Sequence, residues 1–289
     1  MTGTYRESLK AIEAEEVFDL LIYRPIAFLF VKITYSTNIT PNQVSSIAML
    51  SGVIAGVLFG AGTYNYLIAG GVFYFTGNVL DCADGQIARL KKNGTKTGRI
   101  IDGFIDYVVS TAVFIGIGIG LVKYSNDGLY IWTLTVLAGI SSAVQAFCFD
   151  LYRNKFLENV YGKFSSLENE IKEFEEEGER IRDIRGKNLD KFLIAIYLIY
   201  THLQIKLQPR KTKEEVKEIA TVPQEYYRKN KLLLRLWSLA GSTTHITVCI
   251  FCAFINKLEW YLLVCLIPMN ALIIILYVIQ RLVNKNSGE

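Results

Sequence analysis

The sequence predicts an all-α integral membrane protein with six transmembrane helices. Hydrophobic residues make up 51% of the 289 positions, and the mean hydropathy is +0.28. Charged residues account for another 20%, and they are segregated from the long apolar runs. Several of those runs approach the roughly 20 residues that an α-helix needs to cross a bilayer. Together these observations favour a bundle of membrane helices with one wet, charged side.

The six predicted spans are joined by short turns on one side and by cationic segments on the other. We place the spans at residues 43–61, 65–85, 100–122, 129–150, 235–255 and 259–280. The turns between the first and second, third and fourth, and fifth and sixth spans carry few cations. The positive-inside rule therefore predicts that both termini and the loop after the second span face the cytoplasm, which would mean the inner membrane in a bacterium.

The first 40 residues are predicted to form cytoplasmic and interfacial helices. Residues 4–20 read as a charged helix that ends at Arg24-Pro25, and they are too charged for a secretory signal peptide. The next apolar helix, 26–35, is too short to span and is expected to lie in the interface as an amphipathic helix. Thr40 is the predicted N-cap of the first span.

A charged insertion, residues 152–231, separates the fourth and fifth spans. Residues 163–185 show apolar positions at helical spacing and predict an amphipathic helix, with a bend at Gly178. The apolar run 192–206 is short for a span and is read as interfacial or re-entrant. The chain is therefore predicted to have four parts: the cytoplasmic and interfacial helices 1–40, spans one to four within 41–151, the insertion 152–231, and spans five and six within 232–289.

Four carboxylates gather at the predicted cytoplasmic ends of the second and third spans. Asp81 and Asp84 are three residues apart, and Asp102 and Asp106 are four apart, so each pair shares one helix face. A short loop between the two helices lets the pairs face each other. Converging carboxylates at a membrane boundary need a hard divalent cation to neutralise them, or else they must diverge into water.

These residues resemble the signature of the CDP-alcohol phosphotransferase family, also called CDP-alcohol phosphatidyltransferases. The match covers eight fixed positions within 26 residues: Asp81, Asp84, Gly85, Ala88, Arg89, Gly98, Asp102 and Asp106. The resemblance implies a membrane homodimer that moves a phosphoalcohol group from a CDP-linked donor to an alcohol and releases CMP. The insertion 152–231 departs from the family pattern, in which these helices are tightly connected.

The resemblance also implies a role for each motif residue. It assigns two Mg²⁺ or Mn²⁺ ions to the four acids, Asp81, Asp84, Asp102 and Asp106, with Asp106 also serving as general base. It places the cytidine against the small residues Gly85, Ala88 and Gly98, which would otherwise serve close helix packing. Arg89 is expected to bind a phosphate, and the alternative is a topology anchor.

The expected substrates are a CDP-linked lipid, with CDP-diacylglycerol preferred, and a small polar alcohol. An inositol phosphate or another polyol phosphate is the preferred acceptor. A basic patch of Arg153, Lys155 and Arg235 is a candidate site for its phosphate, and anchoring to lipid headgroups is the alternative. The net charge of +4 is too small to indicate nucleic acid. His245 is expected to be a polar packing residue.

Two other functions remain open. A catalytically inactive scaffold of the same fold would recruit partners through residues 152–231, and it would tolerate Asp106→Asn. A cation transporter is disfavoured, because its acids would lie nearer the bilayer centre than these, which flank a cationic loop.

Overall fold

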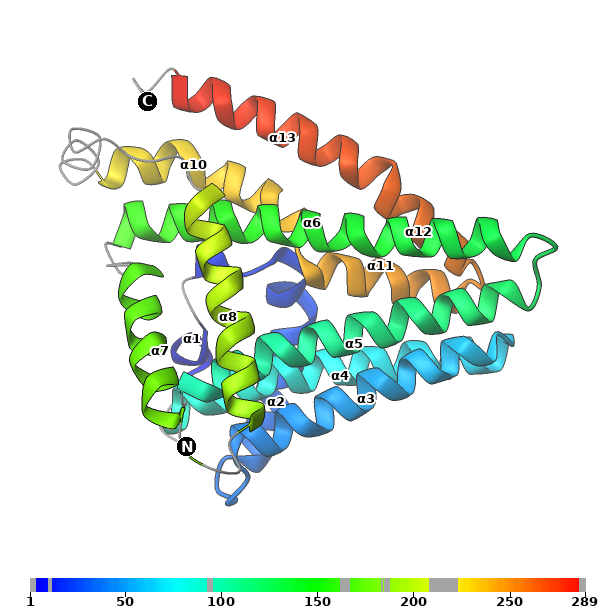
Figure 1. The fold of residues 1–289 in the computed structure, drawn as a ribbon, viewed down its shortest axis with the longest axis horizontal. Coiled ribbons are helices and arrows are strands. Elements are labelled where there is room, and N and C mark those ends of the chain that lie inside the picture. Colours follow the sequence, from blue (N-terminus) through cyan, green and yellow to red (C-terminus); the bar gives the residue numbers. More distant parts are fainter. Residues whose placement is uncertain are drawn as a thin grey trace.

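The computed structural model describes residues 4–9, 12–92, 96–161, 167–182, 184, 188–207 and 223–285, which form helices joined by turns and contain no strand. In chain order its α-helices are α1 Tyr5–Ser8, α2 Arg24–Thr34, α3 Pro41–Ala61, α4 Tyr64–Lys91, α5 Lys96–Val122, α6 Gly128–Tyr161, α7 Leu167–Ile181, α8 Asn188–Leu207, α10 Pro223–Trp237, α11 Ser242–Phe254, α12 Leu258–Leu266 and α13 Pro268–Lys285. The long helices run side by side along the molecule, and α7 and α8 lie across one end (Figure 1).

Helix α3 begins at the cap that the sequence predicts. Thr40 accepts a hydrogen bond from the Gln43 amide, and the Gln43 side chain accepts one from the Thr40 amide, which completes a capping box. Pro41 occupies the first turn, where its missing N–H costs nothing. The helix ends at Gly62, whose φ of 79° is the left-handed conformation typical of a C-cap.

Small residues bring α3 close to its two neighbours, α4 and α5. A Cβ built on Gly56 would lie 2.5 Å from the backbone oxygen of Ala112 on α5, and one on Gly77 of α4 would lie 3.2 Å from the Ala48 oxygen. Close backbone approach through small residues is how membrane helices gain van der Waals contact in the absence of a hydrophobic driving force. Helix α3 therefore holds the two acid-bearing helices, α4 and α5, in one layer.

The long apolar helices indicate a multi-pass integral membrane protein. By length and composition, four described segments can cross a membrane: Pro41–Ala61, Gly103–Val122, Gly128–Tyr161 and Leu258–Val283. A fifth is the pair Gln224–Ala240 and Ser242–Phe254, which is bent by 44°. The predicted span 65–85 forms helix α4 but is not among these segments, because glycines, Asn and Asp dilute its apolar residues. Six spans therefore remain a prediction.

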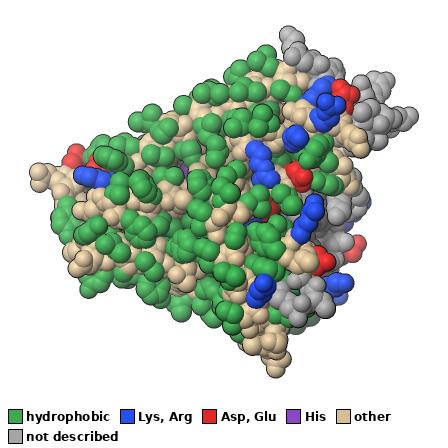
Figure 2. All heavy atoms as spheres, turned by 180° about the vertical axis from the view of Figure 1, so that it is seen from behind, with side chains coloured by type: hydrophobic (Ala, Val, Ile, Leu, Met, Phe, Trp, Pro, Cys, Tyr) green, Lys and Arg blue, Asp and Glu red, His purple; other side chains and the backbone are tan. Residues whose placement is uncertain are grey.

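Charged side chains gather at one end of the molecule. In Figure 2 a broad hydrophobic surface covers most of the body, and Lys, Arg, Asp and Glu concentrate near the end where α1, α7, α8 and α10 lie in Figure 1. A largely apolar surface of this extent suits contact with lipid rather than water. The charged end is the end at which the α4 and α5 acids sit.

The prediction of one charged helix over residues 4–20 is wrong. The chain instead forms α1, a 3₁₀ turn at Ile12–Ala14 and a π-helical turn at Asp19–Tyr23, which continues directly into α2. Pro25 lies in the first turn of α2 and does not interrupt it. The physical reason is burial: Glu15, Glu16 and Asp19 are all less than 10% exposed, so the backbone bends to bring them to polar partners rather than water.

The insertion forms a helical pair in its described part. Phe174 and Ile181 of α7 pack against Ile194 of α8, and α7 passes through Gly178 without interruption. Phe192 of α8 meets Phe104 of α5 edge to face, with ring centroids 6.5 Å apart. The pair is thus attached to the acid-bearing helix α5. The boundary of the insertion at 231 falls inside α10, because the helix starts at Pro223 and runs unbroken past it.

Candidate active site

The two acids of α4 lie on one side of the helix and are sheltered to different degrees. Asp84 is 5% exposed, and Asp81 is half-buried. Ser45, one turn into α3, donates a hydrogen bond from its hydroxyl to Asp84 Oδ2. The capped start of α3 therefore fixes the orientation of one carboxylate oxygen. A carboxylate held by a neighbouring hydroxyl is a typical support for a metal ligand.

Of the two motif acids on α5, only Asp106 has a described side chain. Asp106 is exposed and lies on the lining of a cavity. Asp102 lies one turn earlier on α5. The Asp102 side chain and the surroundings of Gly98 are outside what the structure describes. Within the described part of the chain, no three Asp, Glu, His or Cys side chains are grouped as a metal site. The convergence of four carboxylates on metal ions remains a prediction.

The donor chemistry of these residues fits a hard divalent cation. The candidate ligands on α4 and α5 are all carboxylates, which suit Mg²⁺ or Mn²⁺ rather than zinc or copper. The hydrogen bond from Ser45 to Asp84 leaves further lone pairs on that carboxylate for a cation. Asp81, Asp84, Asp102 and Asp106 are the residues that would hold such ions.

Gly85, one of the small residues predicted to contact cytidine, lies next to a folded-back arginine. A Cβ built on Gly85 would lie 3.2 Å from Arg89 Nη2, so the guanidinium covers the face that the missing side chain leaves open. Arg89 Nε donates to the Ser8 carbonyl, and Nη2 is buried without a hydrogen-bond partner among the described residues. Burial lowers the pKa of Arg89 to about 10, so the group is still a cation at neutral pH. Ala88 is half-buried on the same helix.

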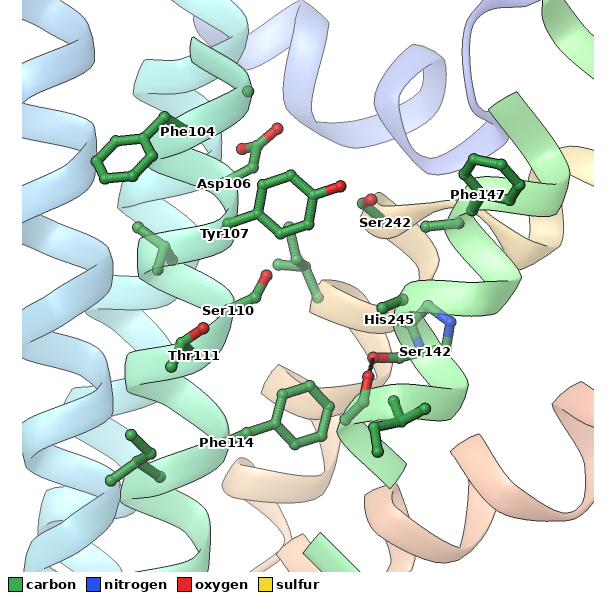
Figure 3. A pocket seen from close by; sticks show the side chains of 18 of the residues that line it. Phe104, Asp106, Tyr107, Ser110, Thr111, Phe114, Ser142, Phe147, Ser242 and His245 are labelled. Atoms are coloured by element: carbon green, nitrogen blue, oxygen red, sulfur yellow. Dashed lines mark hydrogen bonds between the residues drawn. The ribbon is translucent and has the colours of Figure 1, made fainter. Parts of the chain in front are cut away.

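A cavity of about 610 Å³ extends from Asp106 between α5, α6, α8, α11 and α12. In Figure 3 Asp106 and Tyr107 stand at one end, and Phe114 stands two helical turns further along α5. Asp150 of α6 also lines the cavity, and the aromatic rings of Trp132 and Tyr261 form part of its wall. The cavity therefore joins the carboxylate that is the candidate general base to a largely apolar interior.

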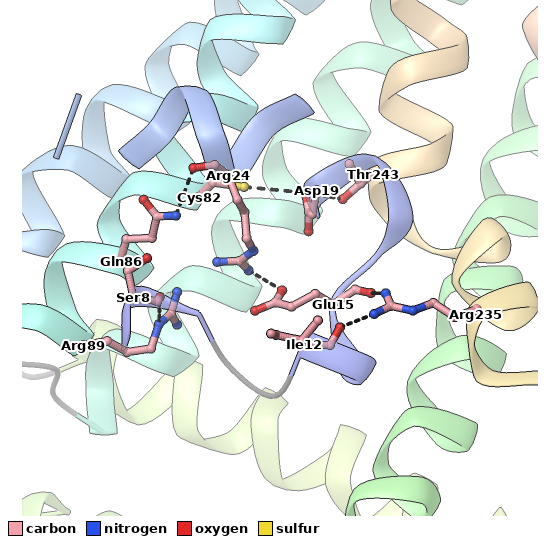
Figure 4. Close-up of polar contacts among 10 residues, drawn as sticks. All are labelled: Ser8, Ile12, Glu15, Asp19, Arg24, Cys82, Gln86, Arg89, Arg235 and Thr243. Carbon is pink, nitrogen blue, oxygen red and sulfur yellow. Dashed lines mark hydrogen bonds and ion pairs between the residues drawn. The ribbon is translucent and has the colours of Figure 1, made fainter. Parts of the chain in front are cut away.

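The three cations predicted to bind an acceptor phosphate have different surroundings. Arg153 forms an ion pair with Asp150, Nη2 to Oδ1 2.8 Å, which places it beside the cavity lining. Lys155 follows Arg153 by two residues on α6 and is half-buried. Arg235 instead donates to the backbone carbonyls of Ile12 at 2.6 Å and Glu15 at 2.8 Å (Figure 4). Arg235 thus fastens the N-terminal segment, a role that the sequence analysis missed.

A buried polar cluster in the N-terminal segment was also missed. Arg24 Nη2 and Glu15 Oε2 form an ion pair of 2.7 Å, with side chains 9% and 4% exposed. Asp19 accepts from the Thr243 hydroxyl at 3.1 Å and from Cys82 at 3.5 Å, as Figure 4 shows. Burial raises the pKa of Asp19. Sequence offered little signal for this cluster, because the partners of Asp19 lie 63 and 224 positions away along the chain.

Glu16 occupies the most enclosed position of this segment. Its Oε2 accepts the Thr243 amide at 3.0 Å, at the start of α11, and the missing side chain of Gly241 leaves room for its carboxyl group. Burial raises its pKa well above the usual value, and the nearby charge of Asp19 adds to that shift. A carboxyl group held between the first residues of α11 positions that helix against the N-terminal segment.

Comparison with known proteins finds a family match over the region that holds the motif acids. The model of the CDP-alcohol phosphatidyltransferase family matches residues 38–167, from the cap of α3 through α6. The chain is 25% identical over 165 residues to the bifunctional IPC transferase and DIPP synthase of Thermococcus kodakarensis, which covers 56% of this chain and 33% of that protein. It is 33% identical over 107 residues to the archaetidylinositol phosphate synthase of Pyrococcus horikoshii, covering 37% of this chain and 52% of that protein.

The alignment with these relatives is partial, since the chain spans between a third and about half of their lengths. The matched stretch nevertheless includes both helices that bear the motif acids, together with α3, which packs against both of them. The motif residues and the family match thus agree on one region. The chain carries a CDP-alcohol phosphatidyltransferase domain over residues 38–167.

Proposed function

We propose that this protein transfers a phosphatidyl group from CDP-diacylglycerol, or a related CDP-linked lipid, to an inositol phosphate and releases CMP. The single observation that carries the proposal is the place of Asp106. This residue belongs to the matched domain and stands at one end of a cavity of about 610 Å³. The name of the Pyrococcus relative, an archaetidylinositol phosphate synthase, supports the inositol phosphate acceptor.

In this proposal Asp106 takes the proton from the attacking hydroxyl of the acceptor. The hydroxyl oxygen forms a bond to the lipid-bearing phosphorus, the bond between that same phosphorus and the bridging oxygen breaks, and CMP leaves with the bridging oxygen. Divalent cations, when bound by the motif aspartates, neutralise charge on the diphosphate. Ser45 holds Asp84 in position. Arg89, which lies against Gly85, would donate hydrogen bonds to a phosphate of the CDP-linked donor.

The apolar body and the charged end support a reaction at the membrane surface. A lipid donor can keep its chains in the bilayer while its diphosphate reaches the carboxylates at the charged end. The positive-inside rule assigns that end to the cytoplasm. The motif resemblance supports a homodimer as the assembled enzyme.

The test is CMP release by purified protein with CDP-diacylglycerol, Mn²⁺ or Mg²⁺, and a panel of alcohols. We expect turnover with inositol 1-phosphate, its abolition by EDTA, and a loss of about 10²–10⁴-fold in Asp106→Asn with folding preserved. Glu259→Gln, at the start of α12 near the opposite end, is the matched control and should retain activity. Silence with every alcohol and both metals would favour the scaffold function in its place.

A further inference from the structure

The cavity that begins at Asp106 keeps a polar wall for at least one more turn of helix. Figure 3 shows Ser110 and Thr111 of α5 on one side, with Ser142 of α6 and His245 of α11 across the space. All four residues belong to the lining. Ser110 follows Asp106 by four residues, which is a rise of about 6 Å along the helix. Hydrogen-bonding groups are therefore present beyond the candidate base, before the aromatic end begins.

Among these groups, His245 is a buried residue whose hydrogen-bonding capacity is only partly used. It is 6% exposed, and its Nδ1 lies 3.5 Å from the Cys265 sulfur. Its Nε2 is buried and has no hydrogen-bond partner among the residues that the structure describes. A buried ring nitrogen without a partner is costly, because it has lost water and gained nothing. The side chain lines the cavity, so a ligand atom in that space can supply the missing partner.

The charge of the lining decides which part of a ligand fits. Within the described residues that line the cavity, Asp106 and Asp150 carry the charge, and Lys and Arg are absent. A phosphate is thus poorly matched to the inner part and better matched to the mouth, where Arg153 pairs with Asp150. A neutral hydroxyl suits the interior, because it can donate to or accept from either an imidazole or a serine.

We propose that His245, with Ser110 and Ser142 opposite and beside it, forms a hydrogen-bonding subsite for the non-reacting hydroxyl groups of a polyhydroxy acceptor. This inference rests on the proposed function. The acceptor enters with its attacking hydroxyl at Asp106 and its remaining hydroxyls directed toward His245. Under this arrangement His245 is a specificity-determining contact, and alcohols with few hydroxyl groups gain less from the site.

The test compares His245→Leu and His245→Asn with Thr244→Val. Thr244 is the adjacent residue, equally buried at 6%, but it is not part of the cavity lining and its hydroxyl bonds to the Ser238 carbonyl. For each variant we would measure KM for inositol 1-phosphate, KM for CDP-diacylglycerol, kcat and Tm. We expect His245→Leu to raise the acceptor KM about three- to tenfold, as the loss of one neutral hydrogen bond predicts.

The donor KM should stay within about twofold in His245→Leu, and His245→Asn should recover part of the acceptor affinity because its amide restores a polar partner. An unchanged acceptor KM, a rise confined to the donor KM, or an equal rise in both with a Tm loss matching that of Thr244→Val would overturn the inference. If the wild type uses glycerol 3-phosphate or serine but not inositol phosphate, the acceptor proposed above is wrong. A His245 effect confined to the KM of glycerol 3-phosphate would then still support the subsite, because that alcohol keeps one non-reacting hydroxyl; use of serine alone would overturn the subsite, because serine keeps none.

Discussion

The buried ion pair between Glu15 and Arg24 yields the most direct test of the N-terminal architecture. Its side chains are 4% and 9% exposed and its charged atoms are 2.7 Å apart. Arg24→Met removes the cation and leaves the Glu15 carboxylate buried. Loss of one member of a buried pair typically destabilises by about 3–5 kcal/mol, because the remaining charge is uncompensated. For a large chain this corresponds to a fall in Tm on the order of 10 °C.

Thermal unfolding of the detergent-solubilised protein, followed by tryptophan fluorescence, measures this effect. Adding Glu15→Gln to Arg24→Met removes the stranded charge, so the double variant should recover about half of the lost Tm. Lys229→Met is the matched control, since it breaks the surface pair with Glu225, whose side chains are 41% and 59% exposed, and it should change Tm little. A Tm for Arg24→Met within about 2 °C of wild type, or a double variant less stable than the single one, would refute the reasoning.

Three further outcomes follow from particular contacts. Because burial raises the pKa of Glu16 in the folded protein, its protonated form contributes stability that is complete below the unfolded-state pKa of 4.5 and is lost as pH rises through the folded-state pKa. The variant Glu16→Gln should therefore show a flatter dependence of Tm on pH above 4.5 than the wild type. Ser45→Ala should lower activity at limiting Mn²⁺ by about 10–100-fold, while the exposed neighbour Ser46→Ala should not, as CMP release against metal concentration would reveal. Gly56→Leu should abolish the monodisperse folded peak in size-exclusion chromatography, while Gly103→Ala, with no atom within 4 Å of the added carbon, should keep it.

Hydropathy and local caps predicted the frame of the molecule well. The apolar runs 43–61, 100–122 and 129–150 fall within α3, α5 and α6, and Thr40 caps α3 as expected. These features depend on residues close together in sequence, so periodicity and capping rules suffice to find them. The same holds for the three-residue spacing that places Asp81 and Asp84 on one side of α4.

Tertiary contacts between distant segments were beyond sequence reasoning. A segment with Glu15, Glu16 and Asp19 looks like a solvated helix, because acids are normally exposed. Their partners include Thr243 and Arg235, more than 200 positions away, and no local pattern marks such pairs. The same limit applies to His245, which was expected to pack. One of its nitrogens does meet Cys265, but the other faces a cavity that only the assembled helices create.

The contacts of the N-terminal segment explain why it contains buried charges at all. On one side Ser8 accepts from Arg89, and the Arg24 carbonyl accepts from Gln86 at 3.1 Å, both on α4. On the other side Asp19 and Glu16 accept from Thr243 at the start of α11, two residues before His245.

The segment therefore cross-links the helix that carries two motif acids to the helix that carries the proposed acceptor contact. Directional hydrogen bonds and ion pairs fix such a spacing more sharply than apolar packing does, because their energy falls steeply with distance and angle. We infer that the described residues 4–9 and 12–24 set the separation between the proposed metal-binding side and the proposed acceptor side of the site. On this view a variant such as Arg24→Met affects catalysis although Arg24 touches neither substrate. When activity is measured over a range of temperatures, the variant should lose activity at a lower temperature than the wild type, by the same interval as its fall in Tm.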